Sequence, residues 1–327
     1  MALSKSISDT RPFYLVAAQG ANDPAKSIYG PPTLPYVDSL QAALTQQTAE
    51  SGEDPIEVVP METADFIGLL GTLPDASREA LEPFVMWPYY RAKPGDSDVD
   101  QDVFAHLPDG VPADAVLNDA RDPRYSLGDK MVNYRWAEEC GVAIPGTVEL
   151  SIVEDLDDLP FSYPLVIKGH PSGRGLDVKL CGNVEEAREA FEACKIKGLE
   201  VLAQEYVEES HGRDLRVLVA GGEIALILGR QGGEGEFLSN VSNGGRYFEH
   251  KLSPEDLVTI NKVIEAFPVD IAGIDFLFSE DGLLFTEINS APGWSGLAEG
   301  MAEFLAKLIR KRFDMLSRLN ALEIEGL

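Results

Sequence analysis

Apolar and polar positions along the first third of the chain predict a small α/β lobe. Apolar runs over residues 12–18 and 56–59 are bounded by turn residues, which favours two short buried strands. Residues 91–114 are rich in Pro, Gly and Asp and show no period, so we expect a long surface loop or an insertion on the substrate side. Helices are predicted over residues 37–50, 62–71 and 77–86.

A second unit begins near residue 122. Residues 127–140 carry apolar side chains at helical spacing, and Gly141 is a suitable residue to end that helix. A helix over Val184–Ala193 would begin after Asn183, whose side chain can accept a hydrogen bond from the first turn. Strands are predicted over Thr147–Ile152, Tyr163–Lys168, Val178–Cys181 and Val201–Val207.

The last third of the chain has a strand pattern interrupted by one amphipathic helix. Two hairpins are expected because each pair of alternating runs is separated by a short turn that contains Gly. Their strands are Asp214–Val219 with Glu223–Leu228, and Ile271–Phe278 with Leu283–Asn289. We expect a helix over Pro254–Phe267 with Ser253 as its N-cap, and a closing helix from about Glu299.

Charge restricts the partners that this pattern would allow. The 327 residues include 55 acidic and 27 basic ones, a net charge of −28, so a nucleic-acid partner would be repelled. Any phosphate site must therefore be built from local cations and backbone amides. The same acidity is typical of proteins from a saline cytosol, and this alternative stays open.

Cysteines and hydropathy bear on the compartment. The three cysteines show no metal-like spacing, which favours a reduced, cytoplasmic environment. Residues near the N-terminus contain no apolar h-region, and no run approaches the roughly 18 apolar residues of a membrane span. We expect a soluble cytoplasmic protein without a membrane partner, and self-association is left open.

A lysine at a strand end and the loop that follows it form the first candidate binding element. Lys168 ends an apolar run, and a glycine-rich loop occupies the residues up to Gly175. Such a lysine can contact a phosphate, and the N–H groups of such a loop can bind an anion. The Gly-Lys-Ser/Thr of a P-loop is absent, so taken alone the segment is more often a surface turn.

Two predicted strands carry side chains that suit a metal ion. Asp275 lies within an apolar run, and Glu287 and Asn289 stand two apart, on the same face of their strand. A hairpin can bring all three to one face, where carboxylate and amide oxygens suit Mg²⁺. Each acid alone would be read as a solvent-facing position, whereas the three together predict a metal site.

These segments, in this order, resemble the ATP-grasp superfamily and within it the RimK-type carboxylate–amine ligases, which also resemble glutathione synthetase. The resemblance covers roughly residues 118–300 and rests on seven short stretches. The stretches are Pro164–Lys168, Ser172–Gly175, Gln204–Val207, Gly212–Arg216, Phe237–Asn240 with Gly244–Gly245, Ala272–Asp275 and Glu287–Gly293. The implied fold is α/β with α+β lobes: an N-terminal lobe over 1–118, a small ATP-grasp subdomain with a lid over 119–203, and a large subdomain with the metal site and the C-terminal helix over 204–327.

The resemblance also implies roles for single residues. Those that would bind ATP are Lys130 and Lys168 at the phosphates, Ser172, Gly173, Arg174 and Gly175 in the lid, Glu205, Tyr206 and Val207 at the adenine, Glu209 at the ribose, and Asp214. Arg216, Arg230 and Asn240 would act on the reacting groups. Asp275, Glu287 and Asn289 would hold two Mg²⁺ ions, with Mn²⁺ as an alternative.

The implied activity is amide formation through an acyl-phosphate, with an amino acid or small peptide as substrate and with ADP and phosphate as products. Two alternatives remain: addition of amino acids to a protein C-terminus, and an ATP-binding regulatory module without turnover. One position departs from the pattern, because Leu238 stands where relatives often have Arg. Two alternatives are open: the nearby Arg246 replaces it, or the acyl substrate differs.

Overall fold

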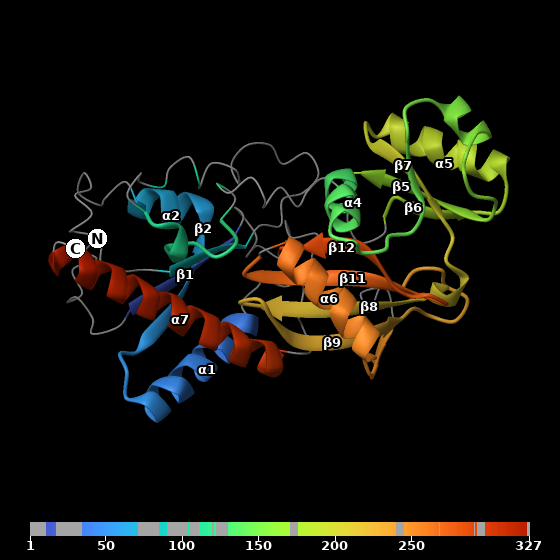
Figure 1. The fold of residues 1–327 in the computed structure, drawn as a ribbon. Helices are drawn as coiled ribbons and strands as arrows, with labels where there is room; N and C mark the ends of the chain where they lie inside the picture. Colours follow the sequence, from blue (N-terminus) through green and yellow to red (C-terminus); the bar gives the residue numbers. More distant parts are fainter. Residues whose placement is uncertain are drawn as a thin grey trace. The chain divides into compact units, whose positions relative to one another are not determined.

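The computed structural model describes residues 11–17, 35–70, 85–89, 104, 107, 111–119, 121, 130–170, 176–239, 245–267, 269–290, 292 and 298–325. The chain divides into two compact units (Figure 1). The N-terminal unit comprises residues 1–125, 269–271 and 291–327, and the central unit comprises residues 126–268 and 272–290. The three-lobe boundaries expected from the sequence stay a prediction.

A parallel sheet with the order β2-β1-β3 forms the N-terminal unit's described core. Its strands are β1 (Arg11–Ala17), β2 (Ile56–Glu62) and β3 (Val85–Tyr89), and its first two helices are α1 (Pro35–Ser51) and α2 (Thr63–Leu70). Both predicted strands and the first two predicted helices are thus confirmed.

The helix predicted over 77–86 is wrong where the structure describes it. Val85 and Met86 begin β3, pair with Phe13 and Tyr14 of β1, and are completely buried. Burial between layers overrides local periodicity here, because a short apolar run fits a strand and a helix equally well. Residues 77–84 lie outside the described residues, as does most of the loop predicted over 91–114. At the end of that loop, Ala113–Ala115 form a 3-10 helix.

The predicted C-terminal helix is α7 (Ala298–Glu325), which packs against α1. Buried side chains along one face, among them Leu305, Ile309 and Phe313, explain its orientation. Arg312 donates to Asp114 and Asp270, and so ties α7 to segments distant in sequence.

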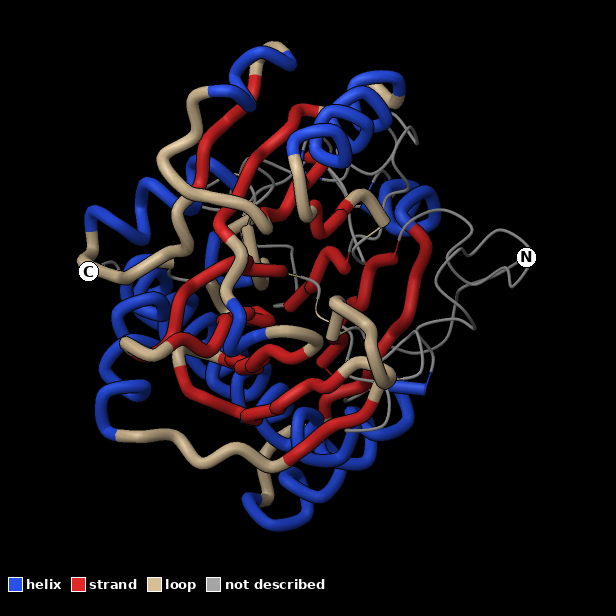
Figure 2. The backbone as a smooth tube through the Cα atoms, turned by 90° about the vertical axis from the view of Figure 1, so that its right-hand side faces the viewer, coloured by secondary structure: helices blue, strands red, loops and turns tan. Residues whose placement is uncertain are grey.

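The central unit contains an antiparallel sheet with the order β4-β7-β5-β6, covered by α5 (Val184–Ile196). The strands are β4 (Thr147–Leu150), β5 (Leu165–His170), β6 (Val178–Cys181) and β7 (Glu200–Glu205). Figure 2 shows strands in red and helices in blue. All four predicted strands are present, and Asn183 caps α5 as predicted by accepting from the Glu186 N–H.

A second antiparallel sheet in this unit has the order β10-β9-β8-β11-β12. Its strands are β8 (Arg213–Ala220), β9 (Glu223–Gln231), β10 (Arg246–Phe248), β11 (Ile271–Ser279) and β12 (Gly282–Asn289), and α4 (Lys130–Glu139) and α6 (Pro254–Ala266) accompany it. Both predicted hairpins are confirmed, whereas β10 was not predicted. Residues 127–129 of the helix predicted over 127–140 lie outside the described residues.

Side-chain alternation gives this second sheet an apolar face and a charged face. Phe276 and Phe285 pair across β11 and β12, and the Phe285 ring contacts those of Phe276, Phe267 and Tyr134. Asp275 precedes Phe276, so its side chain points to the opposite face. The aromatic core therefore fixes the orientation of the carboxylate.

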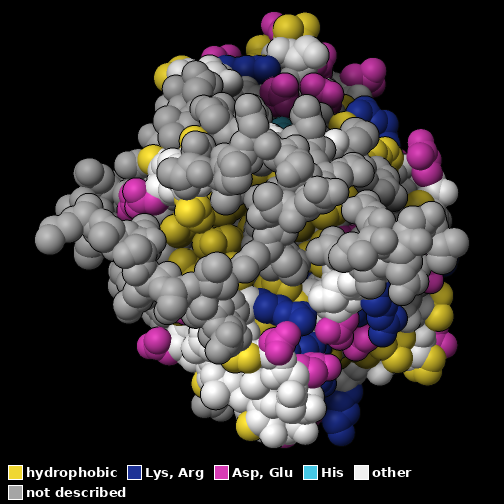
Figure 3. All heavy atoms as spheres, turned by 90° about the vertical axis from the view of Figure 1, so that its left-hand side faces the viewer, with side chains coloured by type: hydrophobic (Ala, Val, Ile, Leu, Met, Phe, Trp, Pro, Cys, Tyr) yellow, Lys and Arg dark blue, Asp and Glu magenta, His cyan; other side chains and the backbone are white. Residues whose placement is uncertain are grey.

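Charges on the surface are mixed, despite the net charge of −28. On the face in Figure 3, Lys and Arg side chains lie beside Asp and Glu side chains. Among the described residues, no helix is both long enough and apolar enough to cross a membrane.

Ser253→Ala should lower the free energy of unfolding by about 1 kcal/mol, because Ser253 caps α6. Its hydroxyl accepts from the Asp256 N–H at 3.0 Å, and the Asp256 carboxylate accepts from the Ser253 N–H at 2.9 Å. Urea denaturation measures the change. An unfolding midpoint equal to that of the unaltered chain would contradict the capping role.

Candidate active site

The two carboxylates predicted to bind metal lie opposite each other on neighbouring strands. Asp275 of β11 pairs with Glu287 of β12, so their side chains share the charged face of the sheet. Asn289, two residues after Glu287, faces the same way, and it pairs with Gly273. The structure therefore brings together the three side chains that the sequence singled out.

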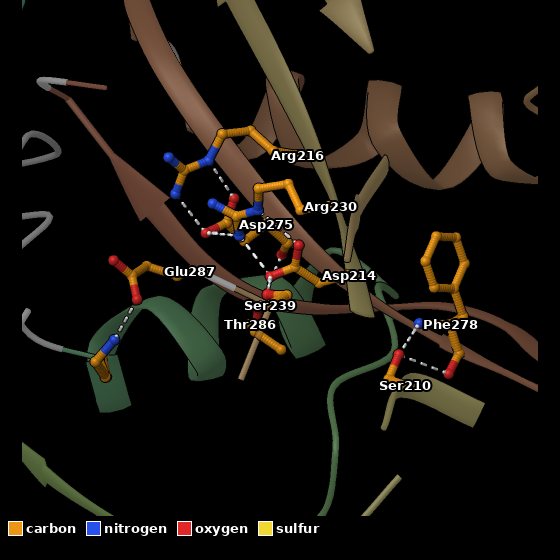
Figure 4. A network of polar contacts seen from close by, with 10 residues as sticks. Ser210, Asp214, Arg216, Arg230, Ser239, Asp275, Phe278, Thr286 and Glu287 are labelled. Carbon is orange, nitrogen blue, oxygen red and sulfur yellow. Dashed lines mark hydrogen bonds and ion pairs between the residues drawn. The ribbon is translucent and has the colours of Figure 1, made fainter. Parts of the chain in front are cut away.

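Asp275 is shared by two guanidinium groups (Figure 4). Arg216 donates to both of its oxygens at 2.7 and 2.6 Å, and an Arg230 nitrogen lies 3.0 Å from Oδ2. Arg230 also donates to both oxygens of Asp214, at 2.6 and 2.5 Å, and the Ser239 hydroxyl donates to Asp214 at 2.6 Å. These contacts join β8, β9 and β11 through one network of side chains, here called the Arg–Asp network.

Ionisation in this network follows from its charges. Burial alone would raise the pKa of the Asp275 carboxyl, but Arg216 and Arg230 lower that pKa to about 2. Burial would lower the pKa of Arg230, but Asp275 and Asp214 raise it above its ordinary value. Both partners are therefore charged at neutral pH.

Glu287 has a different partner. The Lys130 ammonium donates to Glu287 Oε2 at 2.7 Å, which brings α4 to β12. Burial lowers the pKa of Lys130, but Glu287, Tyr134 and Asp275 together more than offset this effect, so the pKa is raised. The Glu287 side chain is 41% exposed, so solvent reaches this carboxylate.

Lys168 is partly buried in the first sheet of the central unit. Its ammonium donates to Gln204 Oε1 at 2.5 Å. Burial, followed by repulsion from Lys130, lowers the pKa of Lys168 to about 7, although Glu287 acts in the opposite direction. This lysine is therefore poised between its charged and neutral forms.

The segment predicted to bind adenine follows β7. Glu205 is the last residue of that strand, and Tyr206 and Val207 are partly exposed beyond it. The Tyr206 hydroxyl and His211 Nδ1 lie 2.8 Å apart, and both rings pack near Phe237. Glu209 is exposed, and its backbone carbonyl accepts from Arg213.

The structure does not describe five other predicted residues. Ser172, Gly173, Arg174, Gly175 and Asn240 lie outside the described residues.

Arg246 does not replace the arginine missing at Leu238. It pairs with Gln231, whereas its neighbour Tyr247 pairs with Arg230, so alternation places Arg246 on the opposite face from Arg230. The Arg213 guanidinium lies over the Phe278 ring at 4.9 Å, which agrees with a surface role.

Sequence reasoning assigned no role to Gln204, Tyr134, Thr147 or Ser239. In the structure Gln204 contacts Lys168 and Ser239 contacts Asp214, while Tyr134 and Thr147 contact Gln204. Gln204 and Ser239 stand within the stretches that carried the family resemblance, one residue before Glu205 and one before Asn240. Tyr134 and Thr147 gave no signal, because only the packing of α4 and β4 brings them to Gln204.

Comparison with solved structures shows that the fold is that of ATP-grasp proteins. A RimK-domain ATP-grasp protein from Sphaerobacter thermophilus aligns over 92% of this chain and 99% of its own, with a TM-score of 0.60 and 18% identity. D-alanine–D-alanine ligase from Bacillus anthracis aligns over 95% and 99%, with a TM-score of 0.63 and 16% identity.

Residues 147–311 match the RimK-like ATP-grasp domain, and the chain belongs to this family. A protein from Syntrophotalea carbinolica named probable alpha-L-glutamate ligase is 32% identical over 190 residues, which are 56% of this chain and 63% of that relative. One of the same name from Marinomonas is 31% identical over 61% of this chain and 67% of its own length. The chain thus spans less than two thirds of the first of these relatives.

Arg230→Met should lower the free energy of unfolding by about 3–5 kcal/mol, because it leaves Asp214 and Asp275 short of a buried counter-charge. Arg230→Lys keeps the charge but cannot contact two carboxylates with a planar fork, so an intermediate loss is expected. Urea denaturation of both variants is the measurement. Equal stability of Arg230→Met and the unaltered chain would show that the Arg–Asp network is not maintained in solution.

Proposed function

We propose that the chain is an ATP-dependent carboxylate–amine ligase that forms an amide through an acyl-phosphate. One observation carries the proposal: a single unit holds a partly buried lysine, Lys168, and an opposed carboxylate pair, Asp275 and Glu287, within the range that matches its family. Relatives named alpha-L-glutamate ligase, and neighbours whose names state D-alanine ligation, support amide formation.

The donor set fits a magnesium ion. Asp275 is ionised, Glu287 is reached by solvent, and Asn289 adds an amide oxygen on the same face. Mg²⁺ takes one or two carboxylates and completes its shell with phosphate and water, which matches this donor set. When bound, such an ion neutralises charge on the phosphates.

The roles proposed for the nucleotide follow the family order and the positions above. Lys168 and Lys130 contact ATP phosphates, and the loop with Ser172, Gly173, Arg174 and Gly175 closes over them. The adenine binds along Glu205, Tyr206 and Val207. Glu209 is assigned to the ribose and Asp214 to the nucleotide site.

Arg216, Arg230 and Asn240 are assigned to the reacting groups. An oxygen of the substrate carboxylate attacks the γ-phosphorus, and the bond to the β-phosphate oxygen breaks to release ADP. The guanidinium groups offset negative charge as it develops. An amine then attacks the acyl carbon, phosphate leaves with the attacking carboxylate oxygen, and the amine loses a proton. Closure of the lid excludes water, which would otherwise hydrolyse the acyl-phosphate.

Amino acids or small peptides are the proposed substrates, because relatives carry the name alpha-L-glutamate ligase. Modification of a protein C-terminus is a second candidate, and the net charge of −28 disfavours an acidic target. The intact Asp275, Glu287 and Asn289 set argues against a regulatory module without turnover. We place the protein in the cytoplasm, since its three cysteines are free thiols.

ADP release should require both a carboxylate and an amine. A screen of pairs of amino acids and small acids, with Mg²⁺ and ATP, measures ADP by a coupled assay and amide products by mass spectrometry. ADP formation without any amide product would contradict ligation and favour a nucleotide-hydrolysing or regulatory role.

Glu287→Gln should reduce turnover by roughly a hundredfold or more while the chain stays folded, because it removes one anionic metal donor. Glu280→Gln, the same change at an exposed position in the turn between β11 and β12, is the matched control. Circular dichroism and ADP release are compared across the two variants. If Glu287→Gln turns over as fast as Glu280→Gln, Glu287 does not hold the metal.

Nucleotide affinity should fall as the pH rises from 7 to 9. Phosphate favours the charged form of Lys168, whose pKa is about 7 in the free protein, so binding takes up a proton in this range and affinity drops by up to about tenfold per pH unit. Calorimetric titration with Mg·ADP measures the effect. Lys168→Met should bind weakly without this slope, whereas Lys179→Met, an exposed lysine on β6, should keep it. An unchanged slope in Lys168→Met would remove Lys168 from the phosphate site.

A further inference from the structure

We infer that Gln204 is a positioning residue that holds the Lys168 ammonium, and that the Thr147 hydroxyl fixes which end of the Gln204 amide faces the lysine, while the Tyr134 hydroxyl accepts the second amide hydrogen. This inference rests on the proposed function, in which Lys168 contacts phosphate. Gln204, Thr147 and Tyr134 are not assigned to substrate contact. Gln204 acts through Lys168.

The register of the first sheet of the central unit brings these residues together. On β7, Gln204 pairs with Thr147 of β4 on one side and with Val166 of β5 on the other. Lys168 stands two residues after Val166, so it is a diagonal neighbour of Gln204 on the same face. Gln204 is 1% exposed, so its polar atoms must find partners within the protein.

Hydrogen-bond geometry determines the orientation of the amide. The Thr147 hydroxyl donates its only hydrogen to the Pro145 carbonyl at 2.7 Å, so toward Gln204 it presents a lone pair. Gln204 Nε2 donates to Thr147 Oγ1 at 2.9 Å and to the Tyr134 hydroxyl at 3.1 Å. Both amide hydrogens are then used, and Oε1 is left to accept from Lys168 at 2.5 Å.

The reverse orientation would be unfavourable at both ends. A flipped amide would place its NH₂ group against the Lys168 ammonium, and its oxygen against the Thr147 oxygen, which has no hydrogen left to donate. Hydrogen bonds are therefore donated in one direction: from the Lys168 ammonium to the Gln204 amide, from the amide to the Thr147 hydroxyl, and from that hydroxyl to the Pro145 carbonyl. One of the three ammonium hydrogens is committed to Gln204, and two remain for a ligand.

Lys168 depends on this acceptor because its surroundings oppose its charge. Burial and the Lys130 ammonium on α4 lower the pKa of Lys168 to about 7, and Glu287 on β12 is the anionic group that raises it. Tyr134 on α4 contacts Gln204, and burial raises the pKa of its phenol, so the phenol is neutral. Loss of the Gln204 oxygen should therefore lower the pKa of Lys168 further, and a carboxylate in its place should raise it.

The first experiment compares Gln204→Met and Gln204→Glu by the pH dependence of Mg·ADP affinity, measured by calorimetry. Gln204→Met should move the pH at which affinity begins to fall downward by about one unit, and should weaken binding at pH 8 about tenfold. Gln204→Glu should move that pH upward. A merely structural role would weaken both variants and move neither profile.

The second experiment tests the orienting hydroxyls. Thr147→Val removes the lone pair that receives Gln204 Nε2, so its pH profile should move in the same direction as that of Gln204→Met, by a smaller amount. Tyr134→Phe should add to this shift in the double variant. Ser253→Ala, which removes the partly buried N-cap of α6, is the control for lost stability and should keep the profile of the unaltered chain.

Outcomes separate this inference from the proposed function. If Lys168→Met binds Mg·ADP as the unaltered chain does, the phosphate role of Lys168 fails and the inference fails with it. If Lys168→Met loses binding but Gln204→Met and Gln204→Glu keep the original profile, only the inference is overturned. Should Gln204→Met not fold, the upward shift in Gln204→Glu and the downward shift in Thr147→Val support the inference, and unmoved profiles in both overturn it.

Discussion

Two guanidinium groups share one buried carboxylate, and the candidate site depends on that arrangement. Arg216 and Arg230 hold Asp275 in its ionised form, and Arg230 in turn orients Asp214. Buried ion pairs contribute little net stability compared with apolar packing, but an unpaired member costs several kcal/mol. The network is therefore better explained by the ionised side chains that it positions on one face of a sheet than by the stability that it adds.

The acidity of the chain makes such local cations necessary. With a net charge of −28, long-range fields repel a nucleotide, so a phosphate site must concentrate positive charge at short range. Lys130, Lys168, Arg216 and Arg230 do so within one unit, each held by a short hydrogen bond to an oxygen acceptor. These acceptors are the protein's own carboxylates and one amide.

Much of the fold could be predicted because its signals are local. Asn183 and Ser253 cap helices through atoms three residues away, and the turn at Ser279–Gly282 sets the register that pairs Phe276 with Phe285. A register shift between Asp275 and Phe276, which no local pattern predicts, then pairs Asp275 with Glu287. The local pattern favours a helix at Val85 and Met86. Their burial in a strand depends on pairing with β1, which is distant in sequence, so no local signal predicts it. The short strand β10 gave no periodic signal.

The candidate site was predictable to a different degree. The sequence singled out Asp275, Glu287 and Lys168 by their places in apolar strands. Their partners, Arg216 for Asp275, Lys130 for Glu287 and Gln204 for Lys168, come from other elements and only tertiary packing selects them. Gln204 is the clearest case. It stands in a stretch that carries the family resemblance, but its hydrogen bond to the Thr147 hydroxyl on β4 is visible only in the structure.

Transfer of heavy oxygen tests the central claim most directly. A substrate carboxylate labelled with heavy oxygen, mixed with its amine partner, Mg²⁺ and ATP, should yield phosphate that carries one labelled oxygen for each amide formed, because that oxygen attacks the γ-phosphorus and leaves with it. Mass spectrometry of the released phosphate measures the transfer. Phosphate without label, or label found in AMP, would contradict an acyl-phosphate ligase.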